Sequence, residues 1–328
     1  MLLQSLTLAT FIVGMLISSL SDQAQEVLCR NGEVFLRKVT GEIIQLTNDG
    51  KKKYEVLLSP DARWVIYRGE PKQDRAMLRL DITMIDVNDS GTKRTIHFHT
   101  ALRSVTKLKW LNDRYFALIG ETNSKNSYYA IFDVKVREVI TELVGYGFSL
   151  STDRLALVYR PFVPRGAPSE FASHYIEIFD LRDQQPARRH EGRKYARLLY
   201  PEHDPDNAFT NLDDRHFVRS NLAWSSDSRS IAFVEQHRRT YWLTILELQQ
   251  VRHGVQVSNI KSFQLAKAEE LQLGDETQVI WKAPDTLVVT GVEWVWDQSM
   301  NQYREGPQVE WQIDLTKGVV SKQETTQR

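Results

Sequence analysis

Cysteine is almost missing from this sequence: Cys29 is the single one in 328 residues. No intramolecular disulfide can form, and there is no Cys-x-x-Cys pair of the kind that binds zinc or exchanges thiols. A chain of this length can bury enough apolar surface to fold without such crosslinks. We therefore expect Cys29 to be a small strand residue.

An excess of either charge is missing as well. Lysine and arginine total 42 residues, aspartate and glutamate also total 42, and the formal net charge is zero. A protein that binds nucleic acid needs basic surface to neutralise phosphates, and no long basic stretch occurs. We expect no nucleic-acid partner.

The motifs of several enzyme classes are absent too. The sequence contains no Gly-x-Ser-x-Gly nucleophile elbow, no P-loop and no glycine-rich dinucleotide fingerprint. No hydrolase-sized segment follows the repeats described below. These absences favour a non-enzymatic protein that uses no cofactor.

One long apolar run occurs, over residues 6–20, followed by a polar stretch with small residues at Ser19, Ser21 and Ala24. Its length suits the core of a signal peptide and is short for a membrane-spanning helix. We expect a signal peptide over residues 1–24 and export to the periplasm or the medium, with no other transmembrane segment. No Lys or Arg precedes the run, and an uncleaved anchor is the alternative.

What the sequence does contain is a short turn that recurs five times, each copy followed by an apolar run. The five copies are Ser59-Pro60-Asp61, Leu111-Asn112-Asp113, Ser151-Thr152-Asp153, Ser225-Ser226-Asp227 and Ala283-Pro284-Asp285. A regular repeat of turns between β-rich runs is typical of blades arranged around an axis.

Further β-rich runs closed by Gly, Asn and Asp follow each copy of the turn. The runs expected as third strands cover residues 82–86, 128–133, 175–180, 241–247 and 309–314. Fourth strands are expected over residues 93–97, 138–143, near Arg188, and over 256–265 and 318–322.

This pattern predicts an all-β fold, a single β-propeller of four-stranded blades over residues 25–323, with a disordered tail over residues 324–328. Outer strands over residues 33–37 and 42–46 precede the first turn, so six blades are expected, with five or seven as alternatives. Pairing of the N- and C-terminal strands would close the ring and leave no long exposed sheet edge.

Two segments carry a more specific resemblance. The run Leu46-Thr47-Asn48-Asp49-Gly50 with the following Ser59-Pro60-Asp61 turn, and the run Ala223-Trp224-Ser225-Ser226-Asp227, resemble the repeat of TolB-like propellers. The other three copies keep the aspartate without the Ser-Pro context. The resemblance implies a propeller fold, although the N-terminal α/β domain of TolB itself has no counterpart before Glu33. Fold resemblance implies little about function.

Strand direction divides the expected propeller into two rims. The aspartate turns lie on one rim, whereas the long insertions 69–79, 161–173, 191–215 and 291–307 lie on the other. Long loops at one end of a rigid β scaffold are where binding sites are commonly built. The insertion rim is therefore the expected binding surface.

The insertions are rich in aromatic and charged residues, which suit a peptide, protein or sugar ligand. The candidate ligand-binding residues are Phe162, Arg165, Tyr200, Glu293, Trp294, Trp296 and Tyr303. Packing of these aromatics against the blades is the competing interpretation. We expect an exported module that binds a protein or peptide there.

The alternative is a carbohydrate-active enzyme, a glycoside hydrolase or lyase, with acids or histidines at the same rim. No catalytic residue is assigned. His203, Asp204 and Asp206 are the weak candidates for a metal site, but the glycine and distal glutamate of a calcium loop are missing. We therefore expect no bound metal.

Overall fold

The computed structural model describes residues 25–74, 77–100, 104–121, 127–162, 175–182, 196–200, 216–251, 254–267, 273 and 277–324. These residues form strands, turns and connecting segments, and no helix, so the expected all-β class is confirmed. In this part of the chain there is no helix long and apolar enough to cross a membrane. The expected signal peptide lies outside the described residues.

The chain divides into two compact units, unit 1 (Met1–Leu118 and Asp133–Glu138) and unit 2 (Ile119–Phe132 and Val139–Arg328). The strands up to the first boundary are β1 (Glu26–Arg30), β2 (Glu33–Arg37), β3 (Ile43–Gln45), β4 (Tyr54–Leu58), β5 (Trp64–Arg68), β6 (Lys72–Asp74), β7 (Met77–Asp86), β8 (Asp89–Thr100), β9 (Ser104–Trp110) and β10 (Tyr115–Glu121). The later strands are β11 (Ser127–Asp133), β12 (Glu138–Leu150), β13 (Ala156–Pro161), β14 (Ile176–Asp180), β15 (Ala196–Tyr200), β16 (Phe217–Val218), β17 (Ala223–Trp224), β18 (Ser230–His237), β19 (Thr240–Val251), β20 (Gly254–Lys267), β21 (Gln278–Ala283), β22 (Thr286–Asp297), β23 (Gln302–Asp314) and β24 (Val319–Glu324).

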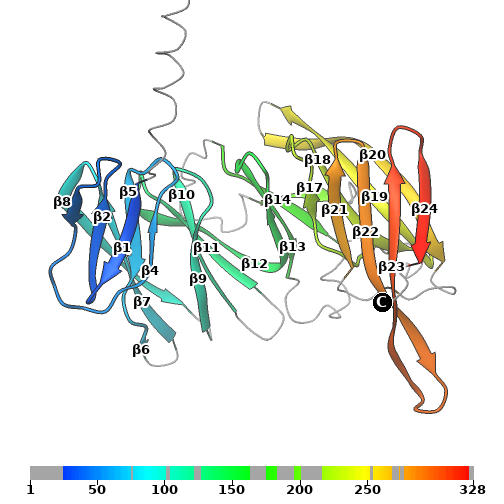
Figure 1. Ribbon diagram of the computed structural model, residues 1–328, viewed down its shortest axis with the longest axis horizontal. Coiled ribbons are helices and arrows are strands. Elements are labelled where there is room, and N and C mark those ends of the chain that lie inside the picture. Colours follow the sequence, from blue (N-terminus) through cyan, green and yellow to red (C-terminus); the bar gives the residue numbers. More distant parts are fainter. Residues whose placement is uncertain are drawn as a thin grey trace, which may run out of the picture. The chain divides into compact units, whose positions relative to one another are not determined.

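Unit 1 contains two antiparallel sheets, β1-β2-β3 and β4-β5-β7-β6, the second with β8 added beside β7 (Figure 1). Val34 and Leu36 alternate along β2 with the partly buried Glu33, Phe35 and Arg37, and they are fully buried against Val65 and Ile85 of the second sheet. Cys29 lies in β1, as expected, and is exposed.

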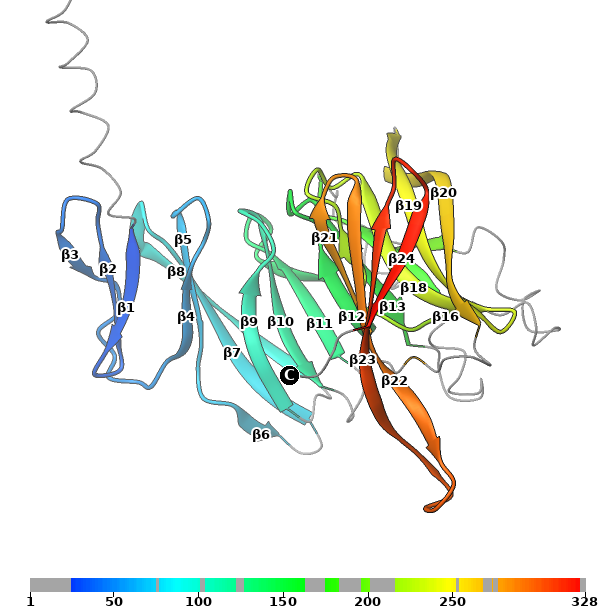
Figure 2. The same cartoon turned by 45° about the vertical axis from the view of Figure 1, so that its right-hand side comes forward.

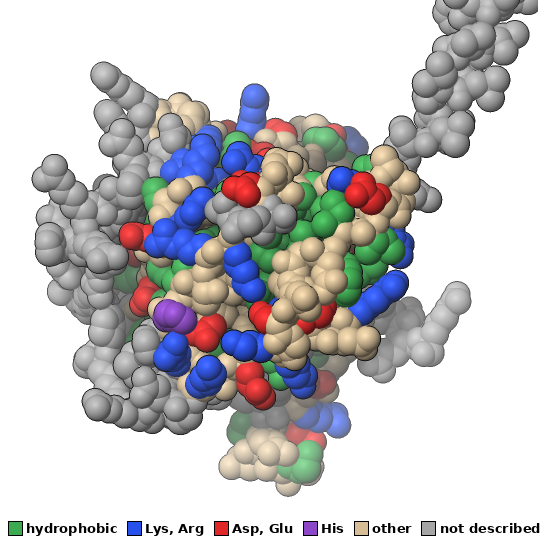
Figure 3. All heavy atoms as spheres, turned by 90° about the vertical axis from the view of Figure 1, so that its left-hand side faces the viewer, with side chains coloured by type: hydrophobic (Ala, Val, Ile, Leu, Met, Phe, Trp, Pro, Cys, Tyr) green, Lys and Arg blue, Asp and Glu red, His purple; other side chains and the backbone are tan. Residues whose placement is uncertain are grey.

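The surface of unit 1 mixes residue types. Figure 3 views the side of Figure 1 that carries β1, β2 and β8, and basic, acidic and apolar side chains lie interspersed on it.

Unit 2 repeats one sheet pattern along the chain, a meander of antiparallel neighbours. The sheets are β11 to β15 of the seven-stranded sheet β15-β14-β13-β12-β11-β10-β9, then β16-β18-β19-β20 with β17 beside β18, and β21-β22-β23-β24 (Figure 2). Apolar residues of successive sheets share one core, where Leu243 and Ile245 of β19 pack with Val289 of β22 and Trp311 of β23. Each sheet therefore buries one face against the next.

The recurring turn joins a first strand to a second strand in all five copies, as expected. In the first copy the Ser59 hydroxyl donates to Asp61 at 2.5 Å and accepts the Trp64 amide at 2.8 Å. Ala62 has φ of 57°, so the chain reverses through a left-handed residue. The same contacts and conformation recur at Ser151, Asp153 and Arg154, and at Ser225, Asp227 and Ser228.

The other two copies of the turn also join two strands, but without the serine–aspartate contact. Asn112 replaces the serine–aspartate pair, and its side-chain oxygen accepts the amides of Arg114 and Tyr115, both at 2.9 Å. In the last copy Ala283 pairs directly with Thr286. Side-chain acceptors that satisfy turn amides explain why Ser, Asp and Asn recur there.

Several expected strand boundaries are corrected by the structure. β12 continues through Leu150 instead of ending near residue 143, and it pairs with both β11 and β13. Residues 144–150 contain two glycines but no turn that could end the strand. The expected fourth strand of one blade and the first strand of the next are therefore one continuous strand. The insertion 69–79 includes β6, which pairs with β7, and β24 extends to Glu324, the first residue of the expected tail. The blade number and the ring closure stay predictions.

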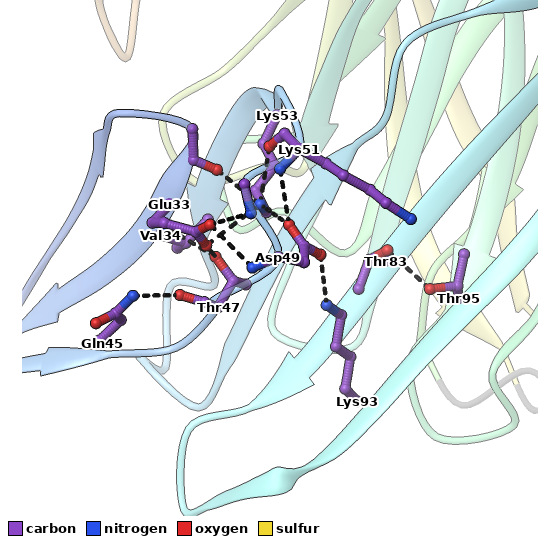
Figure 4. Close-up of polar contacts among 12 residues, drawn as sticks. Glu33, Val34, Gln45, Thr47, Asp49, Lys51, Lys53, Thr83, Lys93 and Thr95 are labelled. Carbon is purple, nitrogen blue, oxygen red and sulfur yellow. Dashed lines mark hydrogen bonds and ion pairs between the residues drawn. The ribbon is translucent and has the colours of Figure 1, made fainter.

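Polar contacts explain the sequence of residues 46–50, which resembles the TolB-like repeat (Figure 4). The Lys53 side chain is 1% exposed, and its ammonium donates to the Asp49 carboxylate at 2.5 Å and to the carbonyl of Gly32 at 2.6 Å. Glu33 accepts the Thr47 hydroxyl at 2.5 Å and the amide of Asp49 at 2.9 Å. These bonds hold the connection from β3 to β4.

Acid should weaken this connection. The hydrogen bond from Lys53 lowers the pKa of Asp49 from 3.8 to about 2. A lowered folded-state pKa stabilises the fold above pH 3.8, and this contribution disappears as the pH falls to about 2. The Asp49→Asn variant should therefore be less stable than wild type at pH 6, and the difference should shrink by pH 2.

Urea unfolding of both proteins between pH 2 and pH 6 measures this difference. The control is Glu42→Gln, which removes an exposed partner of Lys38 and should change stability little. A constant difference between Asp49→Asn and wild type across this pH range would contradict the assignment.

Candidate functional site

The segment 291–307 was expected to be an irregular insertion, and the structure corrects this. β22 and β23 continue as a two-stranded ladder to Asp297 and Gln302, forming the projecting hairpin in Figures 1 and 2. β21 pairs with β22 only as far as Thr290, and β24 pairs with β23 only from Val309. We call residues 291–308 the long hairpin.

Local residues shape the long hairpin. A register shift between Val292 and Trp294 marks a bulge at Gly306 and Pro307, opposite Glu293. A Cβ at Gly306 would lie 2.6 Å from a Val295 methyl and 2.8 Å from the Glu293 carbonyl oxygen, so only glycine fits.

The tip of the long hairpin is closed by Asp297. Its Oδ1 accepts the Ser299 hydroxyl at 2.6 Å and the Ser299 amide at 2.9 Å, and these bonds lower the pKa of the Asp297 carboxyl. Arg304 lies 3.7 Å from the same carboxylate. The turn is therefore ordered by its own polar groups.

Large apolar residues are exposed on this hairpin. Trp296 is 45% exposed and Met300, at the tip, is 57% exposed. Backbone register pairs position 296 with Tyr303 and position 294 with Glu305, so these four positions share one face of the ladder. Three of the predicted ligand-binding residues are thus brought together.

The remaining predicted residues are not among these four positions. Glu293 is in the same hairpin and forms an isolated bridge with Leu273. Phe162 follows β13, is 37% exposed, and donates its amide to the Val144 carbonyl. Arg165, His203, Asp204 and Asp206 lie outside the described residues.

Tyr200 was expected in an exposed insertion loop, and this was wrong. It ends β15, pairs with Ile176, and is 6% exposed because β15 packs into the core of unit 2. Its hydroxyl donates to both carboxylate oxygens of Glu235, at 3.0 and 3.2 Å. Burial, together with the Glu235 charge, raises the pKa of the Tyr200 hydroxyl.

Glu235 is the centre of a polar cluster that sequence reasoning missed. Its side chain is 4% exposed and also accepts the Thr244 hydroxyl at 2.5 Å, and Nδ1 of His216 lies 2.8 Å from its Oε2. A carboxylate can only accept, so this contact places a proton on Nδ1. His237 stacks on the His216 ring at 4.0 Å between centroids.

The cluster orients an imidazole through a buried carboxylate, which is the arrangement used by general bases. Sequence spacing could not find it, since its members come from β15, β18, β19 and the residue before β16. One feature of the sequence indicates a buried glutamate: Glu235 directly follows the apolar run of β18. Among the described residues, no group of three or more His, Cys, Asp or Glu is arranged to hold a metal ion.

Comparison by sequence finds neither a matching family model nor a matching curated protein. Similarity to solved structures does exist. TolB from Acinetobacter baumannii is 13% identical, with 92% of this chain and 63% of that chain covered and a TM-score of 0.36. A eukaryotic initiation factor is 12% identical, with 93% and 63% covered and a TM-score of 0.49.

The β-propeller domain of the trilobed protease from Pyrococcus furiosus is 12% identical, with 91% of this chain and 92% of that chain covered and a TM-score of 0.34. This chain spans less than two thirds of the length of the TolB and initiation-factor structures. The solved structures that this chain is similar to thus include TolB and other propeller proteins.

Proposed function

We propose that this protein is an exported, non-enzymatic β-propeller module that binds a protein or peptide through the insertion rim, with the long hairpin as the main contact. The observation that supports this most is the exposure of Trp296 and Met300 on a hairpin that extends beyond its sheet. Exposed apolar side chains of this size are typical of interaction sites, and aromatic residues dominate binding energy there.

The backbone of the long hairpin favours an extended peptide. Among the described residues, the pairing of β21 with β22 ends at Thr290 and that of β24 with β23 begins at Val309, and beyond them the long hairpin is bridged only at Glu293, by Leu273. Strand edges without a neighbour carry amide and carbonyl groups that a peptide strand can pair with. The aromatic face would then select the side chains of the bound peptide.

A Trp294→Ala, Trp296→Ala variant tests this proposal. In a pull-down from the native exported fraction, it should retain at least about tenfold less of the partner than wild type, as expected for interface aromatics. A photo-crosslinking residue at position 296 should give an adduct with that partner. Partners retained equally by the variant and wild type would refute the proposal.

The matched control is Ile280→Ala. Ile280 lies in β21 of the same sheet and is 43% exposed, close to the exposure of Trp296. Its substitution, and a crosslinker at position 280, should leave partner capture unchanged. Unfolding midpoints for all variants separate lost binding from lost folding.

A carbohydrate-active enzyme is the second candidate, and the His216 and Glu235 pair is the observation that favours it. Both residues lie toward the end of β18 away from its aspartate turn, which is the insertion side of that sheet. Reducing-sugar release that His216→Ala abolishes would favour the enzyme over the binding module.

A further inference from the structure

A pocket of about 540 Å³ opens on the side of unit 2 that carries the aspartate turns, whereas the sequence predicted a binding surface on the other rim. It lies between two copies of the aspartate turn, those at residues 151–155 and 225–229, and beside the β19–β20 connection. This volume is in the range of pockets that bind small molecules.

The pocket has rigid walls because the two turns are bonded to each other. The Asp153 amide donates to the Ser228 hydroxyl at 2.9 Å, and the Thr152 hydroxyl donates to the Ser225 carbonyl at 3.0 Å. The Trp224 indole donates to the Ser149 carbonyl at 3.2 Å, which fixes that ring in place. The cavity therefore exists before any ligand binds.

One part of the lining is apolar. Trp224, Leu248 and Val255 contribute to it, and each is partly buried. A fixed indole with neighbouring aliphatic groups offers a surface for the C–H groups of a ligand. A purely ionic ligand would not use this surface.

The polar part of the lining carries balanced charge. Asp153 and Asp227 contribute carboxylates, and Arg182 and Arg229 contribute guanidinium groups. Arg182 already binds Asp180, with Nε to Oδ1 at 3.0 Å. The hydrogen bond from Ser225 lowers the pKa of Asp227, so this carboxylate is ionised at neutral pH.

Such a lining discriminates by ligand charge. An anion would meet the two turn carboxylates, and a cation would meet the two guanidinium groups. A neutral ligand with many hydroxyl groups can donate to the aspartates and accept from arginine and from the exposed amides of Gln249 and Gln250. Such a ligand leaves few polar groups of the lining without a hydrogen-bond partner.

We infer that this pocket binds a short neutral oligosaccharide, with one sugar face against Trp224 and its hydroxyls on the surrounding planar polar groups. The site is separate from the long hairpin, and the inference does not depend on the proposed peptide binding.

An array of immobilised neutral and acidic oligosaccharides, built from glucose, mannose, galactose, N-acetylglucosamine and uronic acids, tests this inference. Wild type should be retained on neutral oligosaccharides. The double variant Arg229→Met, Gln249→Ala should bind the same sugars about tenfold more weakly, because it loses hydrogen bonds worth about 1.4 kcal/mol in total. Both positions are exposed, so folding should persist.

The matched control is Gln256→Ala. Gln256 pairs with Gln249 across the β19–β20 ladder, is exposed, and does not line the pocket. The Gln256→Ala and Trp296→Ala variants should both bind the sugars as tightly as wild type. No retention on neutral sugars, preference for acidic sugars, or equal binding by the double variant would overturn the inference.

Discussion

Replacing Glu235 with leucine should lower the free energy of unfolding by about 3 kcal/mol, because buried polar partners would lose their acceptor. Tyr200 and Thr244 both donate hydroxyls to this carboxylate, and the His216 Nδ1 lies 2.8 Å from it. Glu235 itself is 3% exposed, so water cannot replace it without opening the core. Urea unfolding followed by circular dichroism measures the loss.

Two further variants show whether the loss arises from the cluster. Glu235→Gln keeps the shape and one acceptor oxygen, so it should cost about half as much. Glu247→Gln is the matched control, since Glu247 lies in β19 and its exposed contact with Lys261 at 2.6 Å should contribute under about 0.5 kcal/mol. A Glu235→Leu protein as stable as wild type would refute the role assigned to the cluster.

Substituting Gly145 with alanine should be similarly severe. Gly145 pairs with Pro161 beside the irregularity in β12, and an added Cβ would lie 2.1 Å from the Arg160 carbonyl oxygen and 2.8 Å from a Tyr159 ring carbon. Contacts this short force β12 and β13 apart, and we expect a loss of about 3 kcal/mol or failure to fold. Soluble yield and the urea midpoint measure the effect.

The atom closest to the added Cβ of Gly145→Ala allows a more specific test of this prediction. Because the 2.1 Å contact is with backbone, trimming the ring with Tyr159→Leu should not restore Gly145→Ala. The control is Gly69→Ala, where the nearest atom would be 3.6 Å away, and it should change stability by less than about 1 kcal/mol. Rescue by Tyr159→Leu would show that side-chain crowding, and not strand spacing, excludes alanine.

The fold was predictable where its signals are local. Side-chain oxygens of serine, aspartate or asparagine accept turn amides two to five residues away in four of the five turns. The β-rich runs that follow all five turns form β5, β10, β13, β18 and β22. The merged strand β12 was missed because glycine weakens a strand without ending it. Local chemistry does not say how far a strand continues once its neighbours pair.

The candidate sites were predictable only in part, for the same reason. Trp294, Trp296 and Tyr303 are close in sequence, so one hairpin brings them together. Tyr200 looked like a loop residue because nothing near it in sequence shows that Glu235 accepts its hydroxyl or that Thr244 donates to the same carboxylate.

The sequence by itself determined an all-β chain of short antiparallel runs joined by aspartate turns, since each turn is stabilised by residues within a few positions of one another. Only the tertiary structure decided where those turns meet. The pocket exists because Asp153 and Ser228, 75 residues apart, share a hydrogen bond, and such contacts depend on how successive sheets pack and not on local sequence. The rim of the aspartate turns, which was not the expected binding surface, therefore carries a pocket.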